Sequence, residues 1–252
     1  MSVTESLTTF GRQLSVGGGG VRRGGNGKGR GGGLGGGNNP GQGGGSGPGP
    51  NIPTPLALLL MNGTNGSTTF TDETGNTTWT ATDATISTTQ SKFGGASGRF
   101  PNTTTNRVSG TNAIFAVGTG DFTASGWFRT DSGNVQGLLY MGPATYDAVY
   151  INSGRVSMYL SGAYRGQSPI VWNTGIWYNF TACRKAGVLK CYINGQGQDS
   201  YSTSHNFSGT TLRWGTDGST SFAFQGYLDA CSFYNVALYD GDFTPPTTEP
   251  SL

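Results

Sequence analysis

The sequence predicts an all-β protein, a two-sheet antiparallel jelly-roll sandwich preceded by an extended glycine-rich arm. From residue 56 onwards, short segments rich in β-branched and aromatic residues follow one another, separated by turn sequences such as Asn65-Gly66 and Asn194-Gly195. No segment of this region has sustained helical periodicity. Between residues 17 and 49 glycine dominates, and no apolar pattern supports secondary structure there.

The expected strands are short and closely spaced along residues 56–246, which we take as one globular domain followed by a tail at 247–252. They are Leu56–Met61, Thr68–Thr71, Thr77–Thr80, Arg99–Phe100, Phe122–Thr130, Gly137–Gly142, Ala148–Asn152, Arg155–Leu160, Trp177–Arg184, Val188–Ile193, Thr211–Trp214 and Phe224–Tyr234.

Residues 1–16 are expected to form a short helix, because Ser2 and Glu5 fit a capping box. Apolar residues recur there at helical spacing, namely Leu7, Phe10 and Leu14. One apolar stripe on so short a segment is marginal alone. The segment is therefore either a fraying terminus or an anchor that docks on another protein.

Residues 17–55 form the arm, which carries the surplus positive charge of the chain. Up to Asn51 there are five positive residues and one negative, a balance of +4, whereas the whole chain has +2. The basic residues of the arm are Arg22, Arg23, Lys28 and Arg30. The rest of the chain has a net charge of −2, which argues against a large nucleic-acid surface on the globular domain. The arm has few basic residues and no aromatic residue between positions 17 and 49. This composition favours a tether that binds partner proteins over a nucleic-acid module.

Three cysteines are expected to be free. Cys183 and Cys191 flank a two-residue turn at Ala186-Gly187, which places Cys183 opposite Lys190. The two sulfurs then point to opposite faces of the sheet, so a disulfide between them is not expected.

The N-terminus shows no secretory signal, and the longest apolar run, Leu56–Met61, is too short to span a bilayer. We therefore expect synthesis in a host cytoplasm and no membrane span.

Four phrases in this order are more specific than the number of strands. They are LLLMNGTNGSTTFTDETGN (58–76), SKFGGAS (91–97) with GTGDFTASGWFR (118–129), IWYNFTACR (176–184) with CYING (191–195), and FQGYLDACSFYNVALYDGDFTPP (224–246). Together they resemble the LamG-like, concanavalin A-like lectin/glucanase jelly-roll domains, and most closely copies found in bacteriophage virion proteins. The resemblance covers about residues 56–246 and leaves out the arm.

The resemblance implies two sheets packed face to face, one of them concave. Strand alternation then places apolar side chains in one core. The residues expected there are Phe180, Ala182, Leu189, Cys191 and Ile193 of one hairpin, together with Trp127, Cys231 and Phe233.

Catalysis is not expected. Glycoside hydrolysis needs two carboxylates a few ångströms apart. The glucanases of the resembled superfamily pair them on one strand, whereas the only glutamates after residue 55 are Glu73, near a turn, and Glu249, in the tail. His205 is the single histidine and is expected to be a solvated loop residue, so a Ser-His-Asp triad is not favoured.

The resemblance also implies calcium near the edge of the sandwich, with Asn62, Asp72 and Asp229 as candidate ligands. The family commonly has Asp where this chain has Asn62, which lowers the charge of such a site. Local bonding is therefore favoured, with Asp72 capping its own turn and Asp229 accepting from backbone. No cofactor is certain, and structural calcium stays an open alternative.

Carbohydrate binding is the usual task implied by the resemblance. It requires exposed aromatic rings that stack on sugars, beside polar groups that bind hydroxyls. The candidates are Tyr146, Tyr150, Tyr159, Tyr164 and Trp172. Each is equally compatible with packing or a subunit interface.

The sequence thus predicts a non-enzymatic structural protein of a bacteriophage virion. Its arm is expected to be anchored to capsid or tail proteins, with the jelly roll on the particle surface as a capsid decoration or cement protein. The alternative is a tail-fibre or baseplate receptor-binding lectin that recognises host-surface glycans. A homo-oligomer is expected, and a trimer suits both hypotheses.

Overall fold

The computed structural model describes residues 52–101, 103–142, 147–170 and 173–252. The expected helix in 1–16 and most of the arm lie outside the described residues, so the anchoring role of Leu7, Phe10, Leu14, Arg22, Arg23, Lys28 and Arg30 stays a prediction. No helix in the described part of the chain has the length and apolar character that a membrane crossing requires.

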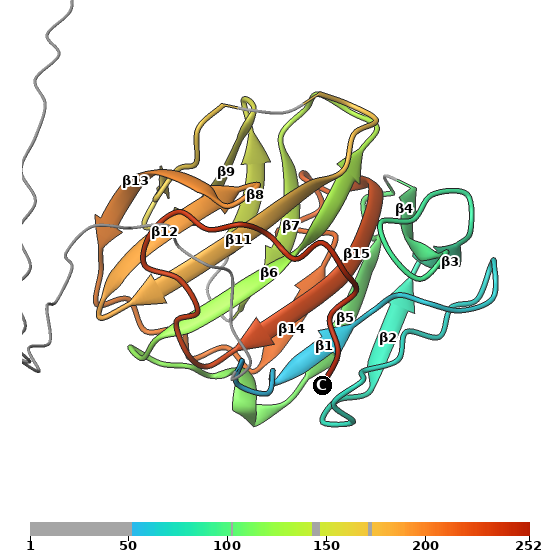
Figure 1. Cartoon of the computed structure of the whole chain (residues 1–252), viewed down its shortest axis with the longest axis horizontal. Coiled ribbons are helices and arrows are strands. Elements are labelled where there is room, and N and C mark those ends of the chain that lie inside the picture. Colours follow the sequence, from blue (N-terminus) through green and yellow to red (C-terminus); the bar gives the residue numbers. More distant parts are fainter. Residues whose placement is uncertain (1–51, 102, 143–146, 171–172) are drawn as a thin grey trace, which may run out of the picture. The chain divides into compact units, whose positions relative to one another are not determined.

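Two antiparallel sheets pack face to face, which confirms the predicted all-β sandwich (Figure 1). Sheet A has the order β13 (Gln196–Ser202), β12 (Val188–Ile193), β11 (Tyr178–Lys185), β6 (Phe122–Thr130), β15 (Gln225–Tyr234), β4 (Ser97–Pro101) and β3 (Thr85–Ser87), and β1 (Ala57–Leu59) also pairs with β15. Sheet B has the order β10 (Ala163–Arg165), β9 (Arg155–Leu160), β8 (Ala148–Asn152), β7 (Gln136–Tyr140), β14 (Thr211–Trp214), β5 (Arg107–Thr111) and β2 (Trp79–Thr82). A 3-10 turn at Ala113–Phe115 is capped by the side chain of Asn112.

The predicted strands mostly match, with two kinds of error. The expected strand Thr68–Thr71 is wrong, because this segment is irregular. The sequence reading also missed β3, β5, β10 and β13. β13 is a mostly exposed edge strand, so it is held by its ladder to β12 and carries no apolar pattern that a sequence could reveal.

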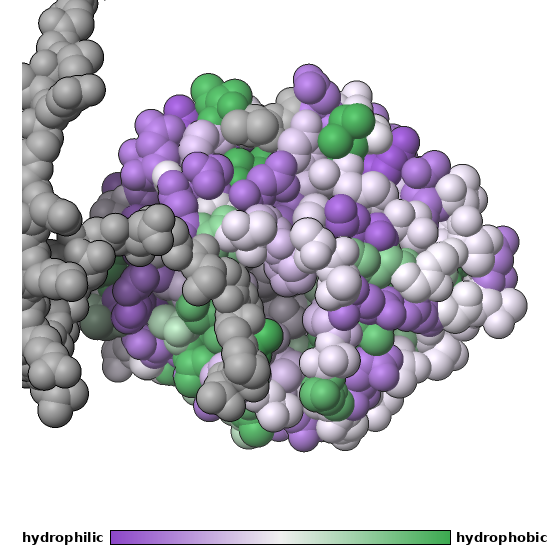
Figure 2. Space-filling model, in the orientation of Figure 1, coloured by the Kyte–Doolittle hydropathy of each residue, from purple (hydrophilic) through white to green (hydrophobic). Residues whose placement is uncertain are grey.

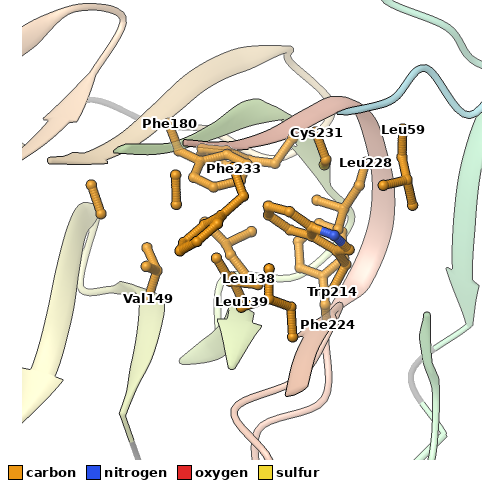
Figure 3. Close-up of a cluster of buried hydrophobic side chains, with 14 of the residues drawn as sticks. Leu59, Leu138, Leu139, Val149, Phe180, Trp214, Phe224, Leu228, Cys231 and Phe233 are labelled. Atoms are coloured by element: carbon orange, nitrogen blue, oxygen red, sulfur yellow. The ribbon is translucent and has the colours of Figure 1, made fainter. Parts of the chain in front are cut away.

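The core lies between the two sheets (Figure 3). Phe180, Cys231 and Phe233 enter it from sheet A, and Leu139 and Trp214 enter it from sheet B. The predicted core residues Phe180, Ala182, Leu189, Cys191, Ile193, Cys231 and Phe233 are all confirmed as buried. The hairpin register pairs Cys183 with Lys190, and all three thiols are free, as predicted.

The predicted burial of Trp127 is confirmed, but its predicted place in the core between the sheets is wrong. Phe128, its neighbour on β6, belongs to the core, so alternation turns Trp127 to the outer side of sheet A. There Phe93 meets it edge-on at 5.8 Å between ring centroids, and the Nζ atom of Lys92 lies 3.9 Å from its ring centroid. Trp127 is buried by this cover and not by the second sheet.

After β15 the chain crosses the outer side of sheet A as a strap, residues 235–252 (Figure 1). The hydroxyl of Thr123 donates to the carbonyl of Val236 and accepts from the amide of Leu238, both at 2.9 Å. The rings of Tyr239 and Phe243 pack against Tyr192 of β12. The strap therefore forms a second, smaller apolar cluster on this side.

As a result, the central strands of sheet A are covered on both faces. Nine of the ten residues of β15 are buried, and β11 is exposed only at Lys185. In sheet B, β5 and β14 instead alternate between buried and less buried positions, as expected where one face of a sheet is open. The middle strands β7 and β8 are buried at all but their last residue. Seen from the strap side, hydrophobic residues stand in separate patches among polar ones (Figure 2).

A buried arginine closes one end of the core. Arg184 has no exposed surface, and its Nε donates to the carbonyl of Gly120 at 2.7 Å. Its two terminal nitrogens donate to the carbonyls of His205 at 2.7 Å and Gly118 at 2.8 Å. The guanidinium carbon also lies 4.7 Å from the ring centroid of Phe207. Burial lowers the pKa of Arg184 from its usual value, and the carbonyl cage compensates for the lost hydration.

We expect Arg184→Met to lower the free energy of unfolding by about 3 kcal/mol or more, because it removes the charge-assisted hydrogen bonds that Arg184 donates to the carbonyls of Gly118, Gly120 and His205. Urea unfolding followed by fluorescence measures this. Lys185→Met is the matched control, because Lys185 forms an exposed pair with Asp240 and its loss should leave the free energy of unfolding nearly unchanged. Equal losses in the two variants would contradict the role of the cage.

Candidate functional site

The open face of sheet B carries one row of side chains in register across all of its strands. Consecutive members of this cross-strand row pair directly with each other; from β10 to β2 they are Tyr164, Tyr159, Ala148, Tyr140, Arg213, Ser109 and Thr80. Neighbouring strands lie about 4.8 Å apart, so the six steps of the row span about 29 Å.

Strand periodicity fixes the direction of this row. Met158 and Leu160 flank Tyr159 on β9, and both belong to the core between the sheets. Leu212 and Trp214 flank Arg213 in the same way on β14. Because successive side chains point to opposite faces, the cross-strand row points away from the core.

At one end of the row lies a tyrosine cluster, made of Tyr150, Tyr159 and Tyr164. The ring centroid of Tyr164 is 5.1 Å from that of Tyr159 and 5.5 Å from that of Tyr150, with edge-to-face geometry. Tyr159 and Tyr164 are half-buried, whereas Tyr150 is 2% exposed. Burial, then the neighbouring Tyr159 and Asp217, raise the pKa of Tyr164, so its hydroxyl stays protonated at neutral pH.

The loop between β14 and β15 holds this cluster in place. The hydroxyl of Tyr150 donates to Oδ2 of the buried Asp217 at 2.9 Å, and Phe222 packs 6.0 Å from the Tyr150 ring. The loop lies directly on Gly137, where an added Cβ would come within 2.3 Å of the Asp217 amide nitrogen. Because glycine has no Cβ, the loop can lie close against β7 at Gly137 and bring Asp217 within reach of Tyr150.

At the other end of the row lies a hollow of about 420 Å³, which we call the basic hollow. Its lining consists of hydroxyl side chains and two arginines: Thr78, Thr80, Thr82, Arg107, Ser109, Thr111 and Arg213. The guanidinium carbon of Arg213 lies 5.0 Å from the ring centroid of Tyr140. Tyr140 thus connects the aromatic and the basic part of the row.

Of the five predicted carbohydrate-binding residues, the structure brings three together, namely Tyr150, Tyr159 and Tyr164. Tyr146 and Trp172 lie outside the described residues. The sequence reading missed Tyr140, Arg213, Asp217 and Phe222. The turn-forming Asp217-Gly218 pair was a local signal for the loop, but nothing local shows that it reaches β8.

Among the candidate calcium ligands, Asp72 is engaged in local hydrogen bonds. Asp72 Oδ1 accepts from the amides of Leu58 and Thr74 and from the Thr74 hydroxyl, while Oδ2 accepts from the Trp79 indole. Its observed contacts therefore fit the predicted turn-capping role. Among the described residues, no three His, Cys, Asp or Glu side chains are placed to hold a metal ion.

Asp229 is in a different situation. Its Oδ2 accepts from the amides of Lys92 and Phe93 at 2.7 and 3.1 Å, as the backbone-bonding prediction requires. Its Oδ1 is buried and has no hydrogen-bond partner among the described residues. Burial raises the pKa of Asp229 to about 7. The two oxygens of this carboxylate therefore differ, since backbone amides satisfy Oδ2 and none of the described residues donates to Oδ1.

Asn62 and Glu249 are linked beside the same 92–94 segment. Asn62 Nδ2 donates to Glu249 Oε1 at 2.8 Å, and the Asn62 side chain lies against Gly94. The charge of Glu249 also contributes to the raised pKa of Asp229. The tail residue Glu249, which the sequence reading assigned no role, therefore supplies a carboxylate near Asp229.

His205 lies in a loop, as expected, but its side chain is paired and only 25% exposed, so the expectation of a solvated side chain is only partly met. Its Nε2 lies 2.8 Å from Oδ2 of Asp147, whose side chain is 5% exposed, and its ring packs 4.6 Å from that of Phe207. Burial raises the pKa of Asp147, an effect that the hydrogen bond from His205 partly offsets. Since the backbone carbonyl of His205 also binds Arg184, this pair belongs to the closure of the core.

The fold and its open face define a lectin-like jelly-roll sandwich with an aromatic and polar sheet surface. Within this class, the family model described as the concanavalin A-like lectin/glucanases superfamily (Laminin_G_3) matches residues 102–242, and the chain belongs to this family. The family resemblance predicted from the sequence is thereby confirmed. None of the curated proteins compared with the chain matches its sequence.

Several solved structures share the fold at low sequence identity. Domain 4 of AbnA, an extracellular arabinanase from Geobacillus stearothermophilus in complex with arabinotriose, is 16% identical with a TM-score of 0.53, over 73% of this chain and 94% of that one. The ligand-binding domain of botulinum neurotoxin serotype D in complex with N-acetylneuraminic acid is 14% identical with a TM-score of 0.55, over 73% and 48%. Trypanosoma rangeli sialidase in complex with sialic acid is 12% identical with a TM-score of 0.54, over 73% and 31%. This chain thus spans less than half of the neurotoxin and sialidase chains.

Proposed function

We propose that the protein is a non-enzymatic glycan-binding protein and that the open face of sheet B is its binding surface. The observation that carries this proposal is the tyrosine cluster at the end of the cross-strand row. Partly exposed tyrosine rings offer apolar faces to sugar rings and keep hydroxyls for hydrogen bonds. The arabinotriose complex of a structural neighbour that this chain covers over 94% of its length adds support by analogy.

The arrangement of carboxylates supports binding without hydrolysis. Asp217, the carboxylate at the tyrosine cluster, is buried and engaged by the hydroxyls of Tyr150 and Ser219. Glu73 is exposed in a turn, and Glu249 binds Asn62 in the strap. Glycoside hydrolysis requires a pair of carboxylates flanking one bond, so we expect bound glycans to be released unchanged.

We expect the full chain to bind a subset of glycans on an array, and Tyr164→Ala to weaken that binding about tenfold or more, because it removes a stacking ring at an edge strand. Phe93→Ala is the matched control, since Phe93 lies over Trp127 on the sheet A side. Thermal unfolding checks that both variants stay folded. No binding of any glycan by the folded wild-type chain would refute the proposed function.

The proposal extends to a structural cation. Asp229, Glu249 and Asn62 offer the oxygen ligands that calcium prefers. A cation bound to Oδ1 of Asp229, which has no partner among the described residues, would compensate the cost of burying this carboxylate. A cation held there would fix the strap to the 92–94 segment.

Calcium is expected to raise the unfolding temperature of the chain by several degrees relative to EDTA, because ligand binding to the native state alone stabilises it. Asp229→Asn should abolish this response, whereas Asp199→Asn, at an exposed position of β13, should keep it. An unfolding temperature that is the same in calcium and EDTA would rule out the structural cation.

A second proposal concerns where the protein works. In this proposal it is displayed on a bacteriophage particle as a capsid decoration or cement protein, as a homo-oligomer anchored by the 1–55 segment. The support is the likeness of the four sequence phrases to phage virion copies and the basic, side-chain-poor composition of residues 17–49.

Immunogold labelling of purified particles is the test, and label over the capsid is the expected result. Label confined to the tail would replace this proposal with the tail-fibre or baseplate receptor-binding alternative. Deleting residues 1–50 should abolish incorporation, and normal incorporation of the deleted form would contradict anchoring by the arm.

A further inference from the structure

We propose that the cross-strand row binds an acidic oligosaccharide, whose chain runs perpendicular to the strands and whose carboxylate or sulfate group is held by Arg213. This inference rests on the proposed glycan-binding function and specifies its ligand. It rests on the basic hollow, because sugar stacking on the tyrosine cluster gives no role to the two arginines that line this hollow.

The electrostatics of the basic hollow favour an anion. The lining contains two guanidinium groups and no carboxylate. Asp83 lies near Arg107 and feels its charge, but Asp83 Oδ2 already accepts from the hydroxyls of Thr103 and Thr105. Arg107 itself donates to the carbonyl of Thr105 at 2.8 Å, which positions its charge at the rim of the hollow.

Arg213 is the residue best placed to bind the ligand. Its guanidinium lies over the ring of Tyr140, and its Nε is buried without a hydrogen-bond partner among the described residues. Arg99 and Arg129 instead bind Asp131. Arg165 resembles Arg213, with a buried Nε that has no partner among the described residues and a guanidinium over the ring of Tyr201, but it does not line the basic hollow. A guanidinium held by a ring and lacking a carboxylate is prepared for a planar anion such as a carboxylate or sulfate.

The hydroxyls around Arg213 suit a sugar. Ser109 pairs with Arg213 on one side and with Thr80 on the other, so the basic group is followed by two hydroxyl side chains along the row. The hydroxyls of Thr111 and Thr211 lie 3.0 Å apart beside them. Such a surface can donate to and accept from sugar hydroxyls while the guanidinium binds the acid group.

The register sets a minimum length for the ligand. Tyr164 and Arg213 are separated by four strand steps, about 19 Å. A monosaccharide cannot contact both, whereas an extended oligosaccharide can. Ala148, between Tyr159 and Tyr140, is fully buried, so the ligand is expected to contact the half-buried rings of Tyr159 and Tyr140 on either side of it.

The test uses the full chain and pairs of matched glycans. An array of acidic oligosaccharides, including oligogalacturonate, is compared with the same compounds after methyl-esterification or desulfation, which remove the charge and keep the sugar chain. The variants are Arg213→Gln, Tyr164→Ala and Lys185→Gln. The last loses the same charge at an exposed position paired with Asp240 and serves as the control.

We expect the acidic member of a pair to bind more tightly, and Arg213→Gln to weaken it by at least about tenfold while leaving the neutral member unchanged. Tyr164→Ala should weaken both members, and Lys185→Gln neither. An oligosaccharide too short to reach from Tyr164 to Arg213 should contact only one of these residues. Its binding should therefore be weakened by only one of the two substitutions.

Neutral members that bind as well as acidic ones, with no effect of Arg213→Gln, would overturn this inference and leave the proposed function standing. Absence of any glycan binding would remove both. An oligothymidylate that binds as tightly as the acidic glycan, with the same dependence on Arg213, would show a general polyanion surface and would also overturn the inference.

Discussion

The burial of the central strands of sheet A on both faces is the constraint on which the rest of the molecule depends. Its inner face forms the core with sheet B, and the strap covers its outer face through Tyr239 and Phe243. β11 and β15 consequently carry almost continuous buried residues, as strands do when both faces are covered. The polar, half-buried face of sheet B is then the sheet surface on which a ligand can lie.

Strand periodicity turns that face into an ordered surface. Each strand of sheet B contributes one outward residue to the cross-strand row, and antiparallel registers align them over about 29 Å. The loop seated on Gly137 then brings Asp217 to the hydroxyl of Tyr150 and stiffens one end of the row. Arg184 closes the core with backbone carbonyls, so this charge is satisfied without any group from the open face.

Much of this could be read from local sequence, and the failures have physical causes. Turn chemistry at Ala186-Gly187 fixed the Cys183–Lys190 register, and alternation found most of the core. The prediction for β6 was shifted by one residue, since Phe128 and not its neighbour Trp127 lies in the core between the sheets. The cross-strand row depends on β14 pairing with β5 and β7, which lie far away in sequence, so no local pattern reveals that Arg213 stands beside Tyr140. The contact of Glu249 with Asn62, 187 residues apart, was hidden for the same reason.

The central claim is that ligands bind on the open face of sheet B and not on the strap side. Hydrogen–deuterium exchange of the full chain, with and without the tightest glycan from the array, tests it most directly. We expect slower exchange in β10, β9, β7 and β14, which carry Tyr164, Tyr159, Tyr140 and Arg213. Protection that instead gathers in β11, β12 and the strap, with sheet B unchanged, would contradict it.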